Sequence, residues 1–129
     1  MKHSTYIAIA AINMFIAVGA GAFGAHGLKA VLSAEMLAVW QTAVHYHMVH
    51  ALGLLGVGVL MTQWNDAQLL HRAALFMLTG IVIFCGSLYA LALTGITWLG
   101  AITPLGGVAF LLAWATLAWC AYRRQSLPT

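Results

Sequence analysis

Three long stretches without an acid, a lysine or an arginine set the architecture of this chain. They cover residues 3–28, 36–65 and 73–122, which are 26, 30 and 50 residues long. A membrane-spanning helix needs about 20 apolar residues, because the hydrocarbon core is about 30 Å thick and a helix rises about 1.5 Å per residue. The first two stretches therefore hold one spanning helix each, and the third is long enough for two.

The third stretch needs a break between its two helices, and Thr94-Gly95-Ile96-Thr97 supplies one because glycine permits a turn. Barrel strands would alternate between apolar and polar residues, and these segments do not. We therefore predict an all-α membrane protein, a bundle of four transmembrane helices that forms one domain over residues 1–129. The predicted helices cover about residues 6–25, 45–62, 69–93 and 98–122.

Composition excludes a soluble enzyme and a nucleic-acid-binding protein. The chain is 64% hydrophobic and 5% charged, whereas a soluble domain carries about 25% charged residues. Its net charge of +3 comes from scattered bases rather than from a basic patch. Lys2, Arg72, Arg123 and Arg124 fall on one side of the predicted bundle, and Lys29 falls on the other. The positive-inside rule then places both termini in the cytoplasm.

The segment between the first two spanning helices contains a signal for a helix start. Ser33 and Glu35 are residue types that favour a helix N-terminus. Leu37, Trp40 and Val44 follow at positions i, i+3 and i+7. We predict a short helix over about residues 33–44 that lies in the outer interface of the membrane and leads into the second spanning helix.

Small residues repeat every four positions on two of the predicted helices. Such rows let helix backbones approach closely in lipid, and they predict tight helix packing and a homo-oligomer. The small residues are Ala17, Gly21 and Ala25 on the first helix and Gly86 and Ala90 on the third.

The chain has two cysteines, Cys85 and Cys120. They are expected to be free thiols, because the predicted topology separates them by about 20 Å in depth.

Polar side chains gather in the outer half of the predicted bundle, one or two on each helix. We predict that they converge near a kink at the proline, with His47 as an additional candidate ligand. Two interpretations stay open: a clasp of hydrogen bonds that fixes helix packing, or a ligand site whose imidazoles bind zinc or copper or serve as axial ligands to haem. Asn13, near the middle of the first helix, is expected to form an interhelical hydrogen bond. The predicted cluster is His26, Tyr46, His50, Tyr89 and Pro104.

Four groups of residues occur in order along nearly the whole chain: Gly19–Leu28 (GAGAFGAHGL), Tyr46 with His50-Ala51-Leu52, Gly86-Ser87-Leu88-Tyr89, and Ile102–Gly107 (ITPLGG). Together they resemble the YgdD/YwdK-type family of small bacterial inner-membrane proteins. The resemblance implies a four-span protein of the inner membrane. It implies no activity, cofactor or catalytic residue, because the function of that family is unassigned. His47 departs from the family pattern, in which glutamine usually follows this tyrosine, so a site that depends on His47 would not be shared by the family.

Three classes of function remain open. An enzyme is not expected, because no hydrolase elbow, Walker loop or metalloprotease helix is present and both acids lie in predicted loops. The first class is a helper or interaction protein, surrounded by membrane lipids, that self-associates or joins a larger membrane complex. The second is a binder of a small ligand, lipid, metal or haem through the His/Tyr cluster. The third is an oligomeric pore or transporter, which the lack of acids and bases within the spans disfavours.

Overall fold

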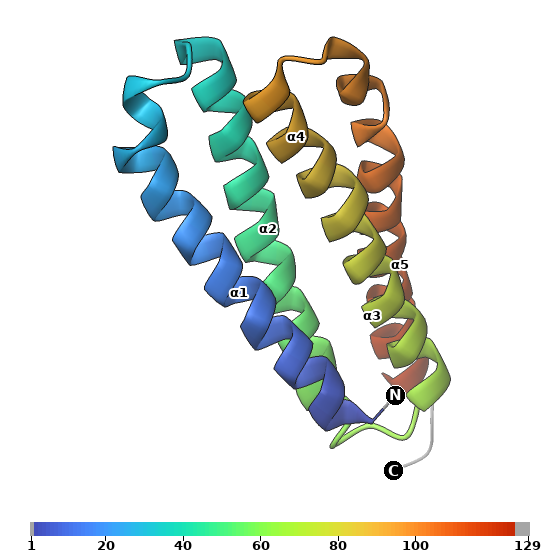
Figure 1. Cartoon of the computed structure of the whole chain (residues 1–129). Helices are drawn as coiled ribbons and strands as arrows, with labels where there is room; N and C mark the ends of the chain where they lie inside the picture. Colours follow the sequence, from blue (N-terminus) through green and yellow to red (C-terminus); the bar gives the residue numbers. More distant parts are fainter. Residues whose placement is uncertain (1, 126–129) are drawn as a thin grey trace.

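The computed structural model describes residues 2–125 and, within them, contains helices and no strands. Four helical segments are long and apolar enough to cross a membrane: His3–Ala30, Ala34–Leu60, Ala67–Thr94 and Thr97–Gln125. They run alternately in opposite directions, so the first and last described residues lie at the same end of the bundle (Figure 1). We call this end the terminal end and the opposite one the loop end. The prediction of an all-α, four-span membrane protein is confirmed.

Several of the spans are built from more than one helical element. Gly95, with a φ of 72°, makes the predicted break between the third and fourth spans, and this left-handed conformation favours glycine. In chain order the elements are α1 (His3–His26), the 3₁₀ turn η1 (Leu28–Ala30), α2 (Ala34–Leu60), α3 (Ala67–Gly80), the π-helical turn η2 (Ile81–Cys85), α4 (Gly86–Thr94), the 3₁₀ turn η3 (Thr97–Ala101) and α5 (Thr103–Gln125).

The predicted interfacial helix over residues 33–44 is wrong as a separate element. Ser33 does begin a helix, and its side chain accepts a hydrogen bond from a first-turn amide at 3.2 Å. That helix is α2, which continues for 27 residues because no glycine or proline interrupts its first half. Its early apolar residues, Trp40 and Val44, are buried against α1 instead of lying on the membrane surface. The Trp40 indole donates to the Ala20 carbonyl at 2.8 Å.

The third span is continuous but contains a π turn that the sequence did not predict. The Gly86 amide donates to the Ile81 carbonyl, five residues earlier. The fourth span packs directly on this turn, since a Cβ atom on Gly106 would lie 2.3 Å from the Phe84 backbone nitrogen. A Cβ atom on Gly80 would lie 2.3 Å from the Phe110 ring. Two glycines therefore permit the close approach of the third and fourth spans.

Pro104 does not kink a helix, so this part of the prediction is also wrong. The residue lies in the first turn of α5, directly after η3. Proline is well accommodated there, because the first turn of a helix has no intrahelical partners for its amides. The helix that follows Pro104 contains no proline within the described residues.

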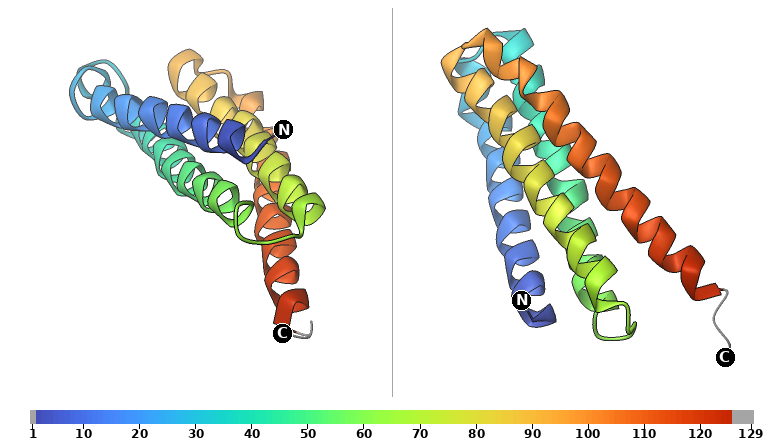
Figure 2. Two further views of the ribbon diagram at one scale, coloured as in Figure 1. Left: turned by 90° about the horizontal axis from the view of Figure 1, so that it is seen from below. Right: turned by 90° about the vertical axis from the view of Figure 1, so that its right-hand side faces the viewer.

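The packing order places α2 between α1 and the third span, while α5 packs on the third span (Figure 2). The apolar core takes buried residues from all four spans, among them Tyr6, Leu54, Leu70, Met77 and Ala113. α1 is the least buried span, because its contacts are mainly with α2.

Candidate functional site

The central histidines of the chain lie at mid-depth in the bundle. α2 extends from residue 34 to residue 60, so His47 is 13 residues from either end of its helix. A helix start at residue 45 would place His47 and His50 near the outer interface, and this predicted placement is wrong. Polar groups in the middle of a membrane are costly unless they are paired, and they are common markers of function.

The first polar group joins three helices through His47, which is buried. Its Nε2 lies 3.0 Å from Asn13 Oδ1 on α1, and its Nδ1 lies 3.0 Å from the Tyr89 hydroxyl on α4. The Asn13 amide nitrogen donates to the Ile9 carbonyl at 2.9 Å. The expected interhelical hydrogen bond of Asn13 is therefore present, with a partner that could not be assigned from the sequence.

The hydrogen bonds of this group determine the tautomer of His47. Because the Asn13 nitrogen donates to a carbonyl, its oxygen is the atom that faces the imidazole and accepts from Nε2–H. The Nδ1 of a neutral ring then accepts from the Tyr89 hydroxyl. The result is a neutral, fully paired chain of donors that all point in one direction, from Tyr89 to the Ile9 carbonyl. Such chains are cooperative in a medium of low dielectric constant.

The second polar group surrounds His50, one helical turn further along α2. Its Nδ1 lies 2.7 Å from the Tyr46 carbonyl, and its Nε2 accepts from the Trp114 indole at 3.0 Å. The ring is stacked on Phe110, with 3.5 Å between ring centroids and 12° between planes. His50 is thus a neutral ring that connects α2 to α5, and both of its nitrogens are engaged.

A cavity of about 470 Å³ lies beside this second group. Its wall is mainly aromatic and apolar, and the lining side chains that carry a polar atom are Tyr46, His50 and Trp114. The Tyr46 hydroxyl forms no hydrogen bond with any of residues 2–125. The cavity can therefore offer an apolar ligand one phenolic hydrogen bond. Its wall also includes Phe84, Pro104, Phe110 and Trp114.

The structure brings together only part of the predicted His/Tyr cluster. Tyr46, His50 and Pro104 line the same cavity, whereas Tyr89 belongs to the His47 group. His26 is exposed at the end of α1, and within the described residues it makes no hydrogen bond or ring contact. The five residues do not converge, because the longer α2 moves its histidines about three turns away from the loop end.

The predicted small-residue rows differ in what they contact. Ala17 is buried, and a Cβ atom on Gly21 would lie 3.2 Å from Val44 on α2. Ala25 is exposed, and the close packing continues through Gly24, which lies against the Trp40 indole. Gly86 faces outward, since a Cβ atom there would meet no atom within 4 Å, and Ala90 is half-buried.

The aromatic partners of the second group were not predicted from the sequence. Trp114 is 64 residues from His50 in the chain, and Phe84 lies in the unpredicted π turn. Neither position differs in local pattern from a lipid-facing aromatic residue, so only the packing of α5 identifies them.

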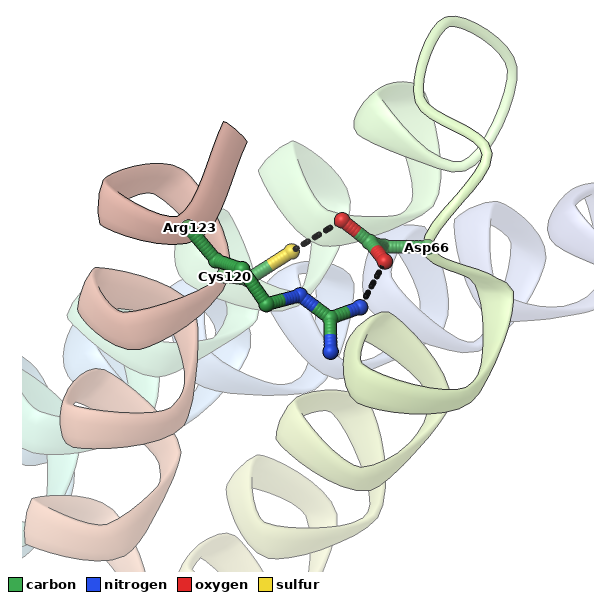
Figure 3. A network of polar contacts seen from close by, with 3 residues as sticks. All are labelled: Asp66, Cys120 and Arg123. Atoms are coloured by element: carbon green, nitrogen blue, oxygen red, sulfur yellow. Dashed lines mark hydrogen bonds and ion pairs between the residues drawn. The ribbon is translucent and has the colours of Figure 1, made fainter. Parts of the chain in front are cut away.

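A third polar group ties the terminal end together (Figure 3). Arg123 near the end of α5 forms an ion pair with Asp66, which precedes α3. The Cys120 thiol donates to the other Asp66 oxygen at 3.7 Å. Cys120 and Cys85 are both buried and both free, as predicted. Among residues 2–125, no three His, Cys, Asp or Glu side chains lie close enough together to hold a metal ion.

Four long apolar helices, joined by short turns and carrying their few charges at the helix ends, define a polytopic membrane protein. The chain belongs to the family described as "Protein of unknown function (DUF423)", whose model matches residues 20–107. It is 48% identical over 118 residues to the UPF0382 membrane protein YwdK of Bacillus subtilis (strain 168), an alignment that covers 92% of this chain and 96% of that protein.

A second relative, the UPF0382 membrane protein SSP2132 of Staphylococcus saprophyticus, is 48% identical over 112 residues, covering 87% of this chain and 92% of that protein. No solved structure matches the chain. The resemblance to the YwdK-type family is therefore confirmed.

Proposed function

We propose that the protein is a non-enzymatic helper or interaction protein of the bacterial inner membrane that self-associates through an outward face of α4. The observation that carries this proposal is Gly86, which lies on the outside of the bundle, where a Cβ atom would have no neighbouring atom within 4 Å. A glycine within a helix is less favourable than alanine by up to about 1 kcal/mol. No close contact inside the bundle offsets this cost at Gly86. Close contact with a second copy of the chain would offset it.

The neighbours of Gly86 distinguish it from two other outward glycines. Gly86 is followed at four-residue spacing by Ala90 and Thr94, so a second helix can approach its backbone closely. Gly19 also has open space around it, but Phe15 and Phe23 flank it on the same face of α1. Gly56 is open as well, between Leu52 and Leu60 on α2. The large flanking side chains would hold a partner away from these two glycines.

Gly86→Leu tests the proposal, with Gly19→Leu and Gly56→Leu as matched controls. All three substitutions add the same side chain at a position where the new Cβ meets no atom within 4 Å, so the controls match Gly86→Leu in this respect. Native mass spectrometry of detergent-solubilised protein should show an oligomer for the parent and both controls, and a monomer for Gly86→Leu. A monomeric parent, or three variants with equal behaviour, would refute the proposed face.

The charges at the two ends support an orientation with both termini in the cytoplasm. Lys2 precedes α1, Arg72 lies near the start of α3, and Arg123 and Arg124 end α5, so these four bases belong to the terminal end; Lys29 lies in η1 at the loop end. This difference follows the positive-inside rule for short loops.

The cavity beside His50 favours a second candidate function, the binding of a lipophilic small molecule that carries a hydrogen-bond acceptor. The aromatic wall supplies apolar contact, and the unpaired Tyr46 hydroxyl supplies a donor. The two His50 nitrogens already have partners, so a metal or haem would have to displace the Trp114 indole or the Tyr46 carbonyl. The ligand proposed for this cavity is therefore a lipophilic molecule rather than a metal ion or haem.

A fatty-acid methyl ester that carries a diazirine can test the cavity by photolabelling and peptide mapping. Labelling should concentrate on the peptides that contain Tyr46 and residues 104–114. Tyr46→Phe should lower that labelling about fivefold, which is the value of one net hydrogen bond. Tyr122→Phe, at an exposed position away from the cavity, is the control. Equal labelling of Tyr46→Phe and parent would exclude the candidate.

A further inference from the structure

A separate cavity of about 430 Å³ lies at the terminal end of the bundle. It is built where the start of α1, the end of α2 and the start of α3 meet. Its lining residues are Lys2, His3, Met61, Ala67, Gln68 and His71. Four of these six side chains carry nitrogen groups that can donate hydrogen bonds, and none is an acid.

His71 is held in place for this cavity by a buried partner. Tyr6, which has no exposed surface, bonds through its hydroxyl to His71 Nδ1. Because the Tyr6 hydroxyl is buried and has no other acceptor among residues 2–125, it donates this hydrogen bond, and the neutral imidazole then carries its proton on Nε2. That nitrogen is the one left for a ligand, because within residues 2–125 His71 has no other hydrogen-bond partner. Tyr6 therefore fixes the ring as a donor whose second nitrogen is available.

The one acid near the cavity is engaged elsewhere. Asp66 immediately precedes Ala67, but its carboxylate pairs with Arg123 and accepts from the Cys120 thiol (Figure 3). It makes no side-chain cap for α3. The negative charge of Asp66 is thus compensated by Arg123 and is not part of the cavity lining.

The cavity also has the depth expected for lipid headgroups. The 24 residues of α1 extend about 36 Å, which exceeds the hydrocarbon thickness of about 30 Å. Lys2 and His3 begin that helix, so they lie at or beyond the hydrocarbon boundary. Basic pockets between transmembrane helices at this level are suited to phosphate-bearing headgroups.

We propose that this cavity binds the phosphate group of an anionic phospholipid. Lys2 supplies the charge, and His71 Nε2–H and the Gln68 amide supply hydrogen bonds to phosphate oxygens. The acyl chains of the lipid would continue along the apolar surface of the bundle. Because the cavity is on a different part of the molecule from Gly86, this site is independent of the proposed self-association.

Native mass spectrometry of the full chain with added phosphatidylglycerol tests the site. Lys2→Gln removes the charge at an exposed position that contributes nothing to the core, and Lys29→Gln removes the same charge at the loop end. Lys2→Gln should weaken phosphatidylglycerol retention about fivefold, the effect expected of one basic residue at an anionic surface. Lys29→Gln should change it less than about twofold. His71→Gln, which can still accept from Tyr6, should also weaken retention.

Three results would overturn the proposal. The first is equal retention by the parent and Lys2→Gln, or an equal loss in Lys2→Gln and Lys29→Gln. The second is equal retention of zwitterionic phosphatidylcholine, which would show that the negative charge is not recognised. The third is displacement of the lipid by millimolar inorganic phosphate, which would identify a free anion as the ligand. Retention of phosphatidylglycerol that resists inorganic phosphate and depends on Lys2 supports the lipid site.

Discussion

The substitution Gly106→Ala measures how tightly the third and fourth spans are packed. The added Cβ would lie 2.3 Å from the Phe84 backbone nitrogen and 2.7 Å from its Cα. Ordinary van der Waals contact begins near 3.4 Å, so α5 must move about 1 Å away from the π turn. Overpacking of this kind lowers the free energy of unfolding by about 3 kcal/mol. The better helix propensity of alanine raises it by about 1 kcal/mol. We expect a net loss of about 2 kcal/mol, or about 7 °C in Tm.

The two buried free thiols provide the assay for this prediction. Cys85 and Cys120 are protected in the folded bundle, so a thiol-reactive fluorescent maleimide reports thermal unfolding in detergent without an added probe site. Gly86→Ala is the matched control, because its new Cβ meets no atom within 4 Å. It should melt at or above the parent temperature. If Gly106→Ala melts together with Gly86→Ala, the close contact between α5 and the π turn does not exist.

Three further predictions address the polar groups and the topology. Tyr89→Phe removes the donor to His47 Nδ1 and should lower the free energy of unfolding by about 1 kcal/mol in the same assay; an unchanged melting temperature would contradict that hydrogen bond. Asp66→Asn breaks an ion pair with the half-exposed Arg123, so it should cost less than about 1 kcal/mol while speeding native-state thiol labelling, and an unchanged labelling rate would argue against the contact. Reporter fusions should behave as cytoplasmic at the C-terminus and as periplasmic within residues 30–35, and the reverse pattern would overturn the proposed orientation.

The number of spans could be predicted because the bilayer imposes it on composition. Each span needs a charge-free segment of about 20 residues, and such segments are visible without any knowledge of packing. The break at Gly95 is also visible, since glycine adopts a positive φ without strain and this one lies midway along a charge-free stretch long enough for two spans.

The depth of the histidines could not be predicted from the same information. An apolar stripe such as Leu37, Trp40 and Val44 has the same spacing whether it faces the membrane surface or another helix. Only the contact of Trp40 with α1 decides between the two. The prediction that residues 33–44 lie in the interface places every residue of α2 too close to the loop end. For this reason it wrongly places His50 beside His26.

Pro104 illustrates a similar ambiguity about helix starts. Pro104 would kink a helix that began at residue 98, but in the structure it lies in the first turn of a helix that follows a 3₁₀ turn. The π turn has no sequence signal at all, because Ile81–Cys85 consists of residues that are equally compatible with a regular helix. The pairing of His47 with Asn13 and Tyr89 depends on all of these boundaries, so it emerges only from the assembled bundle.

The π turn also sets the rotational phase of everything that follows it in the third span. One residue advances an α-helix by about 100°, and η2 accommodates one residue more than a regular turn would. A deletion of Ile83 that restored regular helix would therefore rotate α4 by about 100° relative to α3. Tyr89 would turn away from His47, and Gly86 would leave the outward face. A single inserted residue thus links the hydrogen bonds inside the bundle to the surface that the bundle presents to other molecules.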